Sequence, residues 1–174
     1  MEFRIEEARQ ILERTPAVVS ALLSGVSGAW KESRERPETF SPVDVLGHLI
    51  HGEQTDWIPR LHLILESGEA TAFEPYDHAG YRGVIQSRSV QELLNEFAHL
   101  RKQGLQTLAT IPLDSGQLEQ TGTHPALGRV TLRNLLASWV MHDLGHISQM
   151  VRIMARQYGD AVGPWREYMS ILTR

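Results

Sequence analysis

Apolar residues recur at helical spacing along four long stretches of the chain. The stretches cover residues 2–23, 41–67, 89–110 and 131–158. In each of them apolar side chains return every three or four positions, which places them on one face of a helix. The fourth stretch carries the clearest stripe. The pattern therefore predicts four long helices, each with one face directed toward a shared core.

Local signals mark where several of these helices begin and end. Ser41 can cap the free amides of the second helix, with Pro42 at its first position and Asp44 in its first turn. Ser89 and Glu92 form a capping-box pattern at the start of the third helix. Gly159 follows the fourth stripe, where we expect it to act as a C-cap.

Two prolines interrupt the predicted helices. Pro16 lies inside the first stripe, and because it lacks an N–H we expect a kink or a restart there. Pro59 lies inside the second stripe and is expected to bend that helix.

Three long polar connections join the helices, at residues 24–40, 69–88 and 111–130. No convincing alternating strand pattern occurs, so short extended pieces are expected at most at residues 81–85 and 130–131. The sequence thus predicts an all-α, antiparallel four-helix bundle that occupies residues 1–174 as one domain. A short extra C-terminal turn or helix is expected to pack Trp165 against this body.

Composition narrows the possible functions. The net charge is −4 with no basic cluster, which argues against nucleic-acid binding. The chain has no cysteine, so disulfides, thiolate metal sites and a cysteine nucleophile are excluded. No apolar run approaches the roughly 20 residues that span a bilayer, and the charged N-terminal segment is unlike a secretory signal. We therefore expect a cytoplasmic protein that does not engage membranes.

His142 and His146 are the strongest candidates for chemistry. They are four residues apart on the fourth predicted helix, so both imidazoles project from one face. Two imidazoles in this relation can chelate one metal ion. The face they share is otherwise largely apolar, so it should point inward, where the histidines need polar partners. A metal ion and a buried hydrogen bond both satisfy that need, and both interpretations remain open.

A third ligand has to come from another helix. The second helix offers His48, which lies nearer its apolar stripe and is the first choice. His51 and Glu53 lie closer to its polar side and remain substitutes for His48. The other histidines carry weaker signals, and those in the connections could line the mouth of a site; these are His62, His78, His99 and His124.

Four further residues are candidates for the surroundings of the site. Gln149 lies on the histidine face one turn beyond His146, where it could contact a bound water. Asp143 is about 100° around the helix from His142, so an ion pair with a neighbouring helix suits it better than a metal contact. Trp57 and Trp139 could wall a pocket, although core packing is the simpler interpretation for both.

Two segments together resemble the DinB-like superfamily, which includes YfiT-like hydrolases and thiol-dependent S-transferases. They are SPVDVLGHLIHGEQTDW and, much later, HPALGRVTLRNLLASWVMHDLGHISQMVRIMA. The resemblance runs in order over nearly the whole chain. It implies a four-helix bundle with an unusual connection order and a metal site of three histidines. Carried onto this sequence, the ligands are His48, His142 and His146.

The resemblance also implies function. It suggests zinc or nickel as the metal, a homodimer, and an association with the stress response. Three protein ligands leave a coordination position open, as in catalytic sites. A metal-dependent hydrolase, or an S-transferase that uses a low-molecular-weight thiol such as bacillithiol or mycothiol, is therefore expected to act on a small-molecule substrate. The alternative is a non-catalytic bundle that binds a small ligand or a partner under stress.

Overall fold

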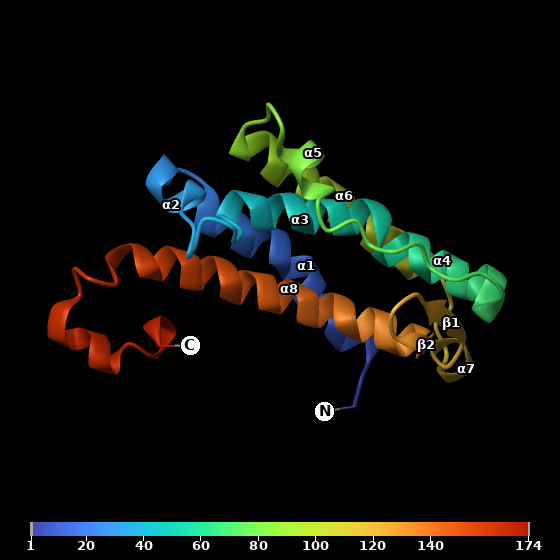
Figure 1. Ribbon diagram of the computed structural model, residues 1–174. Coiled ribbons are helices and arrows are strands. Elements are labelled where there is room, and N and C mark those ends of the chain that lie inside the picture. Colours follow the sequence, from blue (N-terminus) through green and yellow to red (C-terminus); the bar gives the residue numbers. More distant parts are fainter. Residues whose placement is uncertain (1, 174) are drawn as a thin grey trace.

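The computed structural model describes residues 2–173 and is built mainly from helices (Figure 1). The long helices are α1 (Ile5–Leu23), α3 (Pro42–Thr55), α4 (Trp57–Ser67), α6 (Val90–Thr110) and α8 (Leu132–Ala155). Shorter helices are α2 (Gly28–Glu32), α5 (Tyr81–Ile85) and α7 (Ser115–Leu118), and the two strands are β1 (Thr121–His124) and β2 (Gly128–Thr131). Four 3₁₀ turns complete the described chain: η1 (Gly68–Ala70), η2 (Arg156–Tyr158), η3 (Gly163–Tyr168) and η4 (Ser170–Leu172). None of the helices in residues 2–173 is long and apolar enough to cross a membrane.

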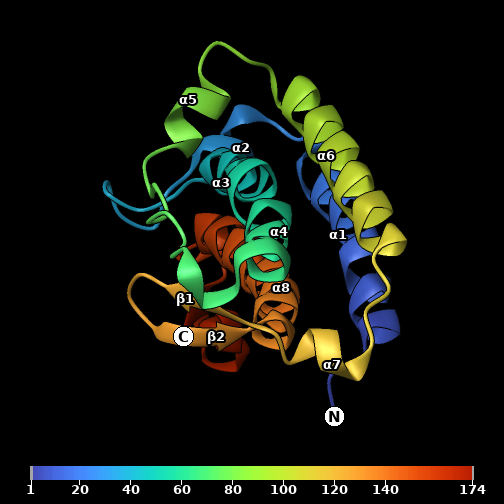
Figure 2. The same cartoon turned by 90° about the vertical axis from the view of Figure 1, so that its right-hand side faces the viewer.

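The long helices form a four-helix bundle, as predicted, with a connection order that differs from a simple up-and-down arrangement. Helix α1 packs against α6 and α8, and α3 packs against the same two helices. Consecutive long helices α1 and α3 therefore lie diagonally across the bundle, which Figure 2 shows nearly end on. The result is that α3 and α8, far apart in sequence, become direct neighbours.

The predicted helix starts are confirmed. The Ser41 hydroxyl accepts the N–H of Asp44, and the Asp44 carboxylate accepts the N–H of Ser41. Ser89 and Glu92 form the same reciprocal pair at the start of α6. Each pair satisfies two backbone donors that the first turn of a helix leaves free.

The two prolines have different effects. Pro16 lies within one continuous helix, so α1 does not restart there. The second predicted helix instead divides into α3 and α4 at Asp56, a turn residue whose φ of −112° and ψ of −67° distort the helical path. Pro59 thus occupies the first turn of α4, where its missing N–H has little consequence.

The connections contain more structure than the sequence predicted. Residues 81–85 were expected to be extended at most, and that prediction is wrong because they form helix α5. Tyr81 in α5 is buried with its ring 4.7 Å from that of Phe40, and Gly47 of α3 leaves room for Ile85. Residues 130–131 do lie in a strand, since β2 pairs with β1 in an antiparallel hairpin.

The C-terminal tail corrects two expectations. Trp165 was expected to pack on the body, but 67% of its surface is exposed. Its turns, η3 and η4, are of the 3₁₀ type and extend the chain beyond α8 (Figure 1). Gly159 caps η2 with an ordinary helical φ of −56°, so it does not use the left-handed conformation that makes glycine a frequent helix terminator.

The apolar core falls into two clusters along the bundle. One includes Leu12, Trp57, Leu61, Leu105, Leu136 and Trp139. The other includes Val19, Leu46, Ile50, Leu93, Phe97 and Met150. On α6 the two clusters are separated by a single buried charged residue, Arg101, which lies between Phe97 and Leu105.

Arg101 joins all four sides of the bundle through its guanidinium group. Its terminal nitrogens donate to both carboxylate oxygens of Asp143 on α8, at 2.6 and 3.0 Å, and to Glu53 on α3 at 2.8 Å. It also donates to the backbone carbonyl of Leu12 on α1 at 2.8 Å. The indole N–H of Trp139 donates to the same Glu53 oxygen at 3.0 Å. The inter-helix ion pair predicted for Asp143 is therefore confirmed.

Replacement of Arg101 by methionine should destabilise the fold strongly. The substitution leaves the buried carboxylates of Glu53 and Asp143 without their cation, and breaking a buried pair in this way costs about 3–5 kcal/mol. Urea unfolding followed by circular dichroism measures the effect. Arg133→Met is the matched control, because the Arg133–Glu119 pair is exposed and worth at most about 1 kcal/mol. Equal losses in the two variants would contradict a central role for the network.

Candidate metal centre

The structure brings together the three histidines that the sequence singled out. His48 comes from α3, and His142 and His146 come from successive turns of α8. One ring nitrogen from each lies within 4.8 Å of the other two. The Nε2 atoms of His48 and His142 are 2.9 Å apart. Neighbouring helices thus present three imidazoles to one point.

Neither substitute for His48 joins this cluster. The His51 ring lies beside Tyr76 and against Gly80, where a larger residue would collide with it. Glu53 faces the opposite way and is held by Arg101 and Trp139. Among the candidates on α3, His48 alone has the geometry of a third ligand.

Hydrogen bonds orient two of the three imidazoles. The Tyr76 hydroxyl lies 3.0 Å from Nδ1 of His48, and Nδ1 of His146 lies 2.8 Å from the amide oxygen of Gln149. These contacts engage Nδ1 and leave Nε2 of each ring directed at the cluster. Metal-binding histidines commonly use the second ring nitrogen in this way. Gln149 was a candidate from sequence, whereas Tyr76 was not singled out and lies in the long connection before α5.

The imidazoles are held in their neutral form. Burial lowers the pKa of His48 to about 4 and that of His142 to about 3, and the neighbouring His146 adds to both shifts. Burial also lowers the pKa of His146, although its bond to Gln149 works in the opposite direction. Neutral imidazole is the form that binds a metal, so the cluster is ready to do so at neutral pH.

The donor set fits a divalent transition metal. Two nitrogens bound at about 2.0–2.1 Å to a tetrahedral ion lie about 3.4 Å apart. The Nε2 atoms of His48 and His142 are 2.9 Å apart, and all three ligand atoms lie within 4.8 Å of one another, so small movements of the side chains reach that value. A ligand set of three imidazoles suits zinc and nickel alike.

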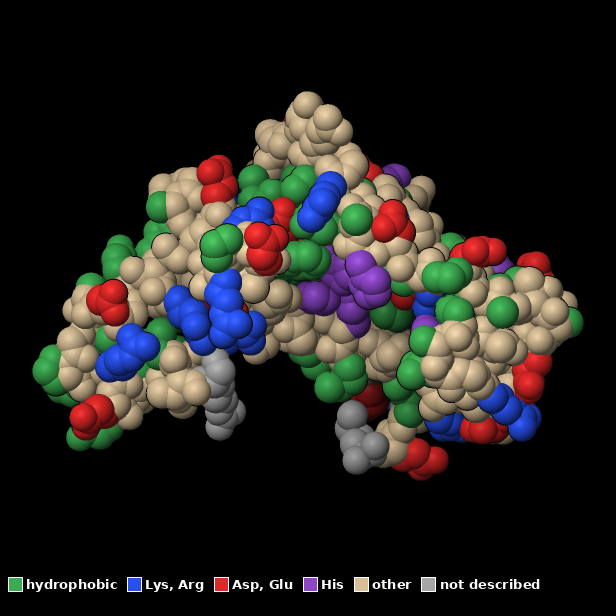
Figure 3. All heavy atoms as spheres, in the orientation of Figure 1, with side chains coloured by type: hydrophobic (Ala, Val, Ile, Leu, Met, Phe, Trp, Pro, Cys, Tyr) green, Lys and Arg blue, Asp and Glu red, His purple; other side chains and the backbone are tan. Residues whose placement is uncertain are grey.

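The cluster opens into a cleft of about 740 Å³. Figure 3 shows histidine side chains gathered at the hollow of this face. The connection before α5 contributes Tyr76 and His78 to the cleft, and the β1–β2 hairpin contributes His124. The volume is typical of sites for small molecules. Two of the histidines that had weaker signals in the sequence therefore line the mouth of the site.

One carboxylate lines the cleft among the described residues, that of Asp56 at the break between α3 and α4. It forms an ion pair with Arg60 at 2.6 Å. Burial nevertheless raises its pKa, against the attraction of Arg60. Sequence analysis missed Asp56, although the proline three residues later signals an irregular backbone at this point.

Aromatic packing supports the back of the site. Trp57 and Trp139 stack with ring centroids 5.6 Å apart, and both are buried in the core. Trp57 also contacts the ring of His142 edge-on at 5.1 Å. The two tryptophans are thus core residues, as the simpler interpretation had it, and Trp57 also holds a candidate ligand in place.

The family of the chain follows from its match to a sequence profile. The profile of the DinB superfamily matches residues 11–150, a range that includes all three histidines. The chain belongs to the DinB superfamily. This confirms the resemblance seen in the helix that carries His48 and the helix that carries His142 and His146.

Two solved structures share the fold of this chain. YfiT from Bacillus subtilis, described as a probable metal-dependent hydrolase with an unusual four-helix bundle topology, is 23% identical with a TM-score of 0.74. The match covers 87% of this chain and 86% of YfiT. TT2238, described as a four-helix bundle protein, is 20% identical with a TM-score of 0.55, over 83% of this chain and 96% of TT2238. No curated protein matches the sequence.

The histidine cluster should make the metal-free protein sensitive to mild acid. Below pH 6.5 histidines of the unfolded chain take up protons, while His48 and His142 in the folded chain stay neutral down to about pH 4 and 3. Protonation therefore favours unfolding, and stability should fall from pH 6.5 toward pH 4. Urea midpoints at pH 7.5 and 5.0, measured with a chelator present, test this. His142→Gln should reduce the dependence, and an unchanged slope in that variant would contradict the assignment.

Proposed function

We propose that this protein is a divalent-metal-dependent enzyme that hydrolyses a small molecule in the cleft above His48, His142 and His146. The observation that carries the proposal is the convergence of three neutral imidazoles at the base of an open cleft. Three protein ligands leave a position for water or substrate, which is the pattern of catalytic rather than structural zinc sites. Membership of the DinB superfamily and the description of YfiT support the same reaction class.

The residues of the chain have separable roles in this proposal. When bound, zinc or nickel lowers the pKa of water or of a thiol and so supplies a nucleophile at neutral pH. Tyr76 and Gln149 hold the rings of His48 and His146 in the orientation that binding requires. The carboxylate of Asp56 lies in the same cleft, where it accepts a proton during the reaction, and its ion pair with Arg60 fixes its position. The connection that carries Tyr76 and His78 and the hairpin that carries His124 form part of the wall of the cleft.

Metal content is the first test. Untagged wild-type protein should contain about one zinc or nickel ion per chain by elemental analysis, and His142→Ala should lose it because two ligands bind far more weakly than three. His99→Ala is the matched control, since His99 is exposed on α6 and distant from the cluster in the chain. Tyr76→Phe should keep the metal but bind it about 10–100-fold more weakly, as expected when a ring loses its orienting partner. An equal metal content in all four proteins would overturn the assignment of the ligands.

Turnover is the second test, with p-nitrophenyl acetate as a first hydrolytic probe. His48→Ala should abolish metal-dependent hydrolysis while circular dichroism shows that the fold persists. Asp56→Asn should retain the metal and lower kcat by about 10²–10⁴-fold, the usual contribution of a positioned acid or base. Unaltered kcat in Asp56→Asn would remove that residue from the mechanism without removing the metal site.

An S-transferase is the alternative reaction, with a low-molecular-weight thiol as co-substrate. The lack of cysteine in the chain is compatible with a thiol supplied from outside. Incubation with monochlorobimane and a thiol such as bacillithiol or mycothiol distinguishes the two reactions, because only the transferase consumes both reactants. A bound metal whose removal lowers the melting temperature, with no turnover in either assay, would favour the non-catalytic binding protein instead.

A further inference from the structure

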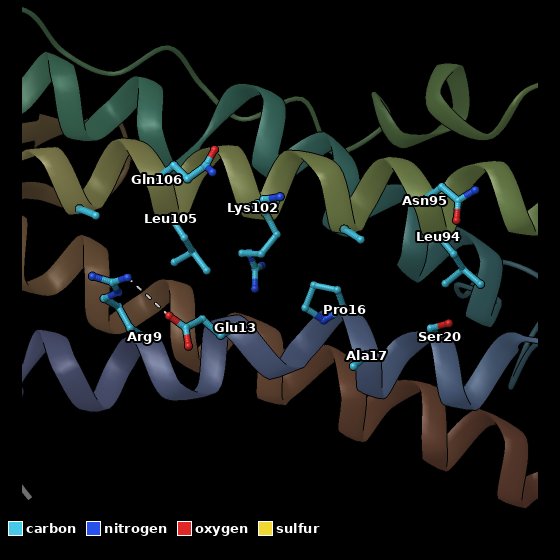
Figure 4. A pocket seen from close by; sticks show the side chains of 13 residues that line it. Arg9, Glu13, Pro16, Ala17, Ser20, Leu94, Asn95, Lys102, Leu105 and Gln106 are labelled. Atoms are coloured by element: carbon cyan, nitrogen blue, oxygen red, sulfur yellow. Dashed lines mark ion pairs between the residues drawn. The ribbon is translucent and has the colours of Figure 1, made fainter.

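A groove of about 630 Å³ runs between α1 and α6, apart from the histidine cleft (Figure 4). The charged side chains at its edge, those of Arg9, Glu13 and Lys102, are open to solvent, so they select no particular ligand. The histidine cleft differs from the groove in this respect. There the β1–β2 hairpin holds one polar side chain whose hydrogen-bonding role the backbone fixes.

That side chain is His124, the last residue of β1. The backbone N–H groups of Ala126 and Leu127 both donate to its Nδ1, each at 3.1 Å. A backbone N–H is always a donor, so Nδ1 accepts with its lone pair and carries no proton. In a neutral imidazole the other nitrogen then carries the single proton. The hairpin turn thus fixes His124 in the form that has its proton on Nε2.

The ring of His124 stays neutral at neutral pH. A proton on Nδ1 would break the two hydrogen bonds from the turn. Burial also lowers the pKa of His124, and the nearby Arg60 lowers it further, whereas Asp56 acts in the opposite direction. His124 is therefore a hydrogen-bond donor at Nε2 and has no nitrogen free to act as a base.

The Nε2–H group is accessible to a bound molecule. His124 is half-buried and lines the cleft together with Asp56 and Tyr76. Within residues 2–173 no hydrogen bond ends on its Nε2, and this nitrogen is not one of the buried atoms that lack a partner. Tyr76 differs, because its hydroxyl already lies 3.0 Å from Nδ1 of His48. Nε2 of His124 thus keeps its proton available to a ligand.

The charges of the lining favour an uncharged ligand. Asp56 and Arg60 carry the charges of the described lining, and they pair with each other at 2.6 Å. The lining also contains His78 and the three candidate metal ligands, and imidazole is mostly neutral at pH 7.5. A charged ligand would find its counter-charge already paired, whereas a neutral carbonyl oxygen finds a donor at His124.

We propose that His124 is a catalytic residue whose Nε2–H donates to the carbonyl oxygen of an uncharged ester or amide. The proposal rests on the hydrolytic function proposed above and names its substrate class. In that reaction the oxygen of water bonds to the carbonyl carbon, its proton passes to Asp56, and the bond to the leaving oxygen or nitrogen breaks. Negative charge grows on the carbonyl oxygen before that bond breaks. A donor held at this oxygen stabilises the charge.

The first test uses full-length protein with a chelator present, so it does not depend on turnover. Proton–nitrogen correlation spectra at pH 7.5 should show one imidazole with its proton on Nε2 that disappears in His124→Asn. The compound p-nitroacetophenone, a neutral carbonyl analogue of p-nitrophenyl acetate, should shift this Nε2 resonance saturably. Two matched compounds, p-nitroethylbenzene without the carbonyl and p-nitrobenzoate with a charge, should bind about fivefold more weakly, as expected when one hydrogen bond is lost.

Variants separate the bond to substrate from the role of His124 in the turn. In His124→Asn the side-chain oxygen takes the place of Nδ1 as the acceptor for the turn, while nothing replaces Nε2–H. This variant should keep its melting temperature and zinc content. Its kcat for p-nitrophenyl acetate should fall about 10²-fold, the usual cost of one lost donor to a developing oxyanion. His124→Gln should recover part of the loss, because its amide nitrogen reaches the position of Nε2.

Leu127→Ala is the matched control in the same turn. The Leu127 side chain is 75% exposed and does not line the cleft, and the residue serves the turn through its backbone N–H. Its kcat should equal that of the wild type.

The contrary results separate this role from the proposed function. A proton on Nδ1, or no shift of Nε2 up to the solubility of p-nitroacetophenone, would overturn the role of His124 whether or not the protein is a hydrolase. Unaltered kcat in His124→Asn would overturn it and leave the hydrolase in place. No turnover in the wild type, with the expected Nε2 shift present, would overturn the hydrolase and reduce His124 to a residue that binds neutral carbonyl compounds.

Discussion

The guanidinium of Arg101 is the point at which the four sides of the bundle meet. It binds oxygen atoms from α1, α3 and α8 while belonging to α6, and both carboxylates that it contacts are buried. Helices packed only by apolar side chains tolerate sliding and rotation, because many arrangements bury similar area. A buried charge does not, since any arrangement that separates it from its partners leaves it unpaired. The network therefore specifies the arrangement of the helices more sharply than the apolar core does.

Pro16 makes one acceptor of the Arg101 network available, although it is not itself bonded to Arg101. A proline has no N–H, so the carbonyl four residues earlier, that of Leu12, loses its helical partner. Arg101 supplies the replacement, at 2.8 Å. The residue that looked like a helix breaker in the sequence thus frees an acceptor at the place where α6 needs one, and α1 continues without interruption.

The same network sets the geometry of the histidine cluster. Asp143 directly follows His142 on α8, so its ion pair with Arg101 fixes the rotation of that helix. With Asp143 turned toward α6, His142 and His146 face α3. The bond between Glu53 and Arg101 fixes the rotation of α3 in the same way, and His48 then faces the histidines of α8. The stability of the core and the shape of the site consequently depend on the same few bonds.

The sequence predicted the features whose causes are local. Helical stripes, the caps at Ser41 and Ser89, and the spacing of His142 and His146 each depend on neighbouring residues, and all of them are found in the structure. The contacts of Tyr76 and Arg101 depend on residues about 30 to 90 positions away, and no local pattern marks them. Helix α5 was missed for the same reason, because burial of Tyr81 against Phe40 decides its conformation. The bound metal, the homodimer and the cytoplasmic location stay predictions.

The diagonal placement of α1 and α3 has a consequence for how the protein is made. His142 and His146 on α8 follow His48 by more than 90 positions in the chain. Helices α3 and α8 are neighbours because α1 and α3 lie diagonally across the bundle. During synthesis the first ligand emerges long before the other two, and closing so long a loop is slow. A nascent chain therefore cannot bring the three histidines together until α8 has emerged as far as His146. The candidate site thus depends on the packing of α8 against α3, which follows the synthesis of all the preceding helices.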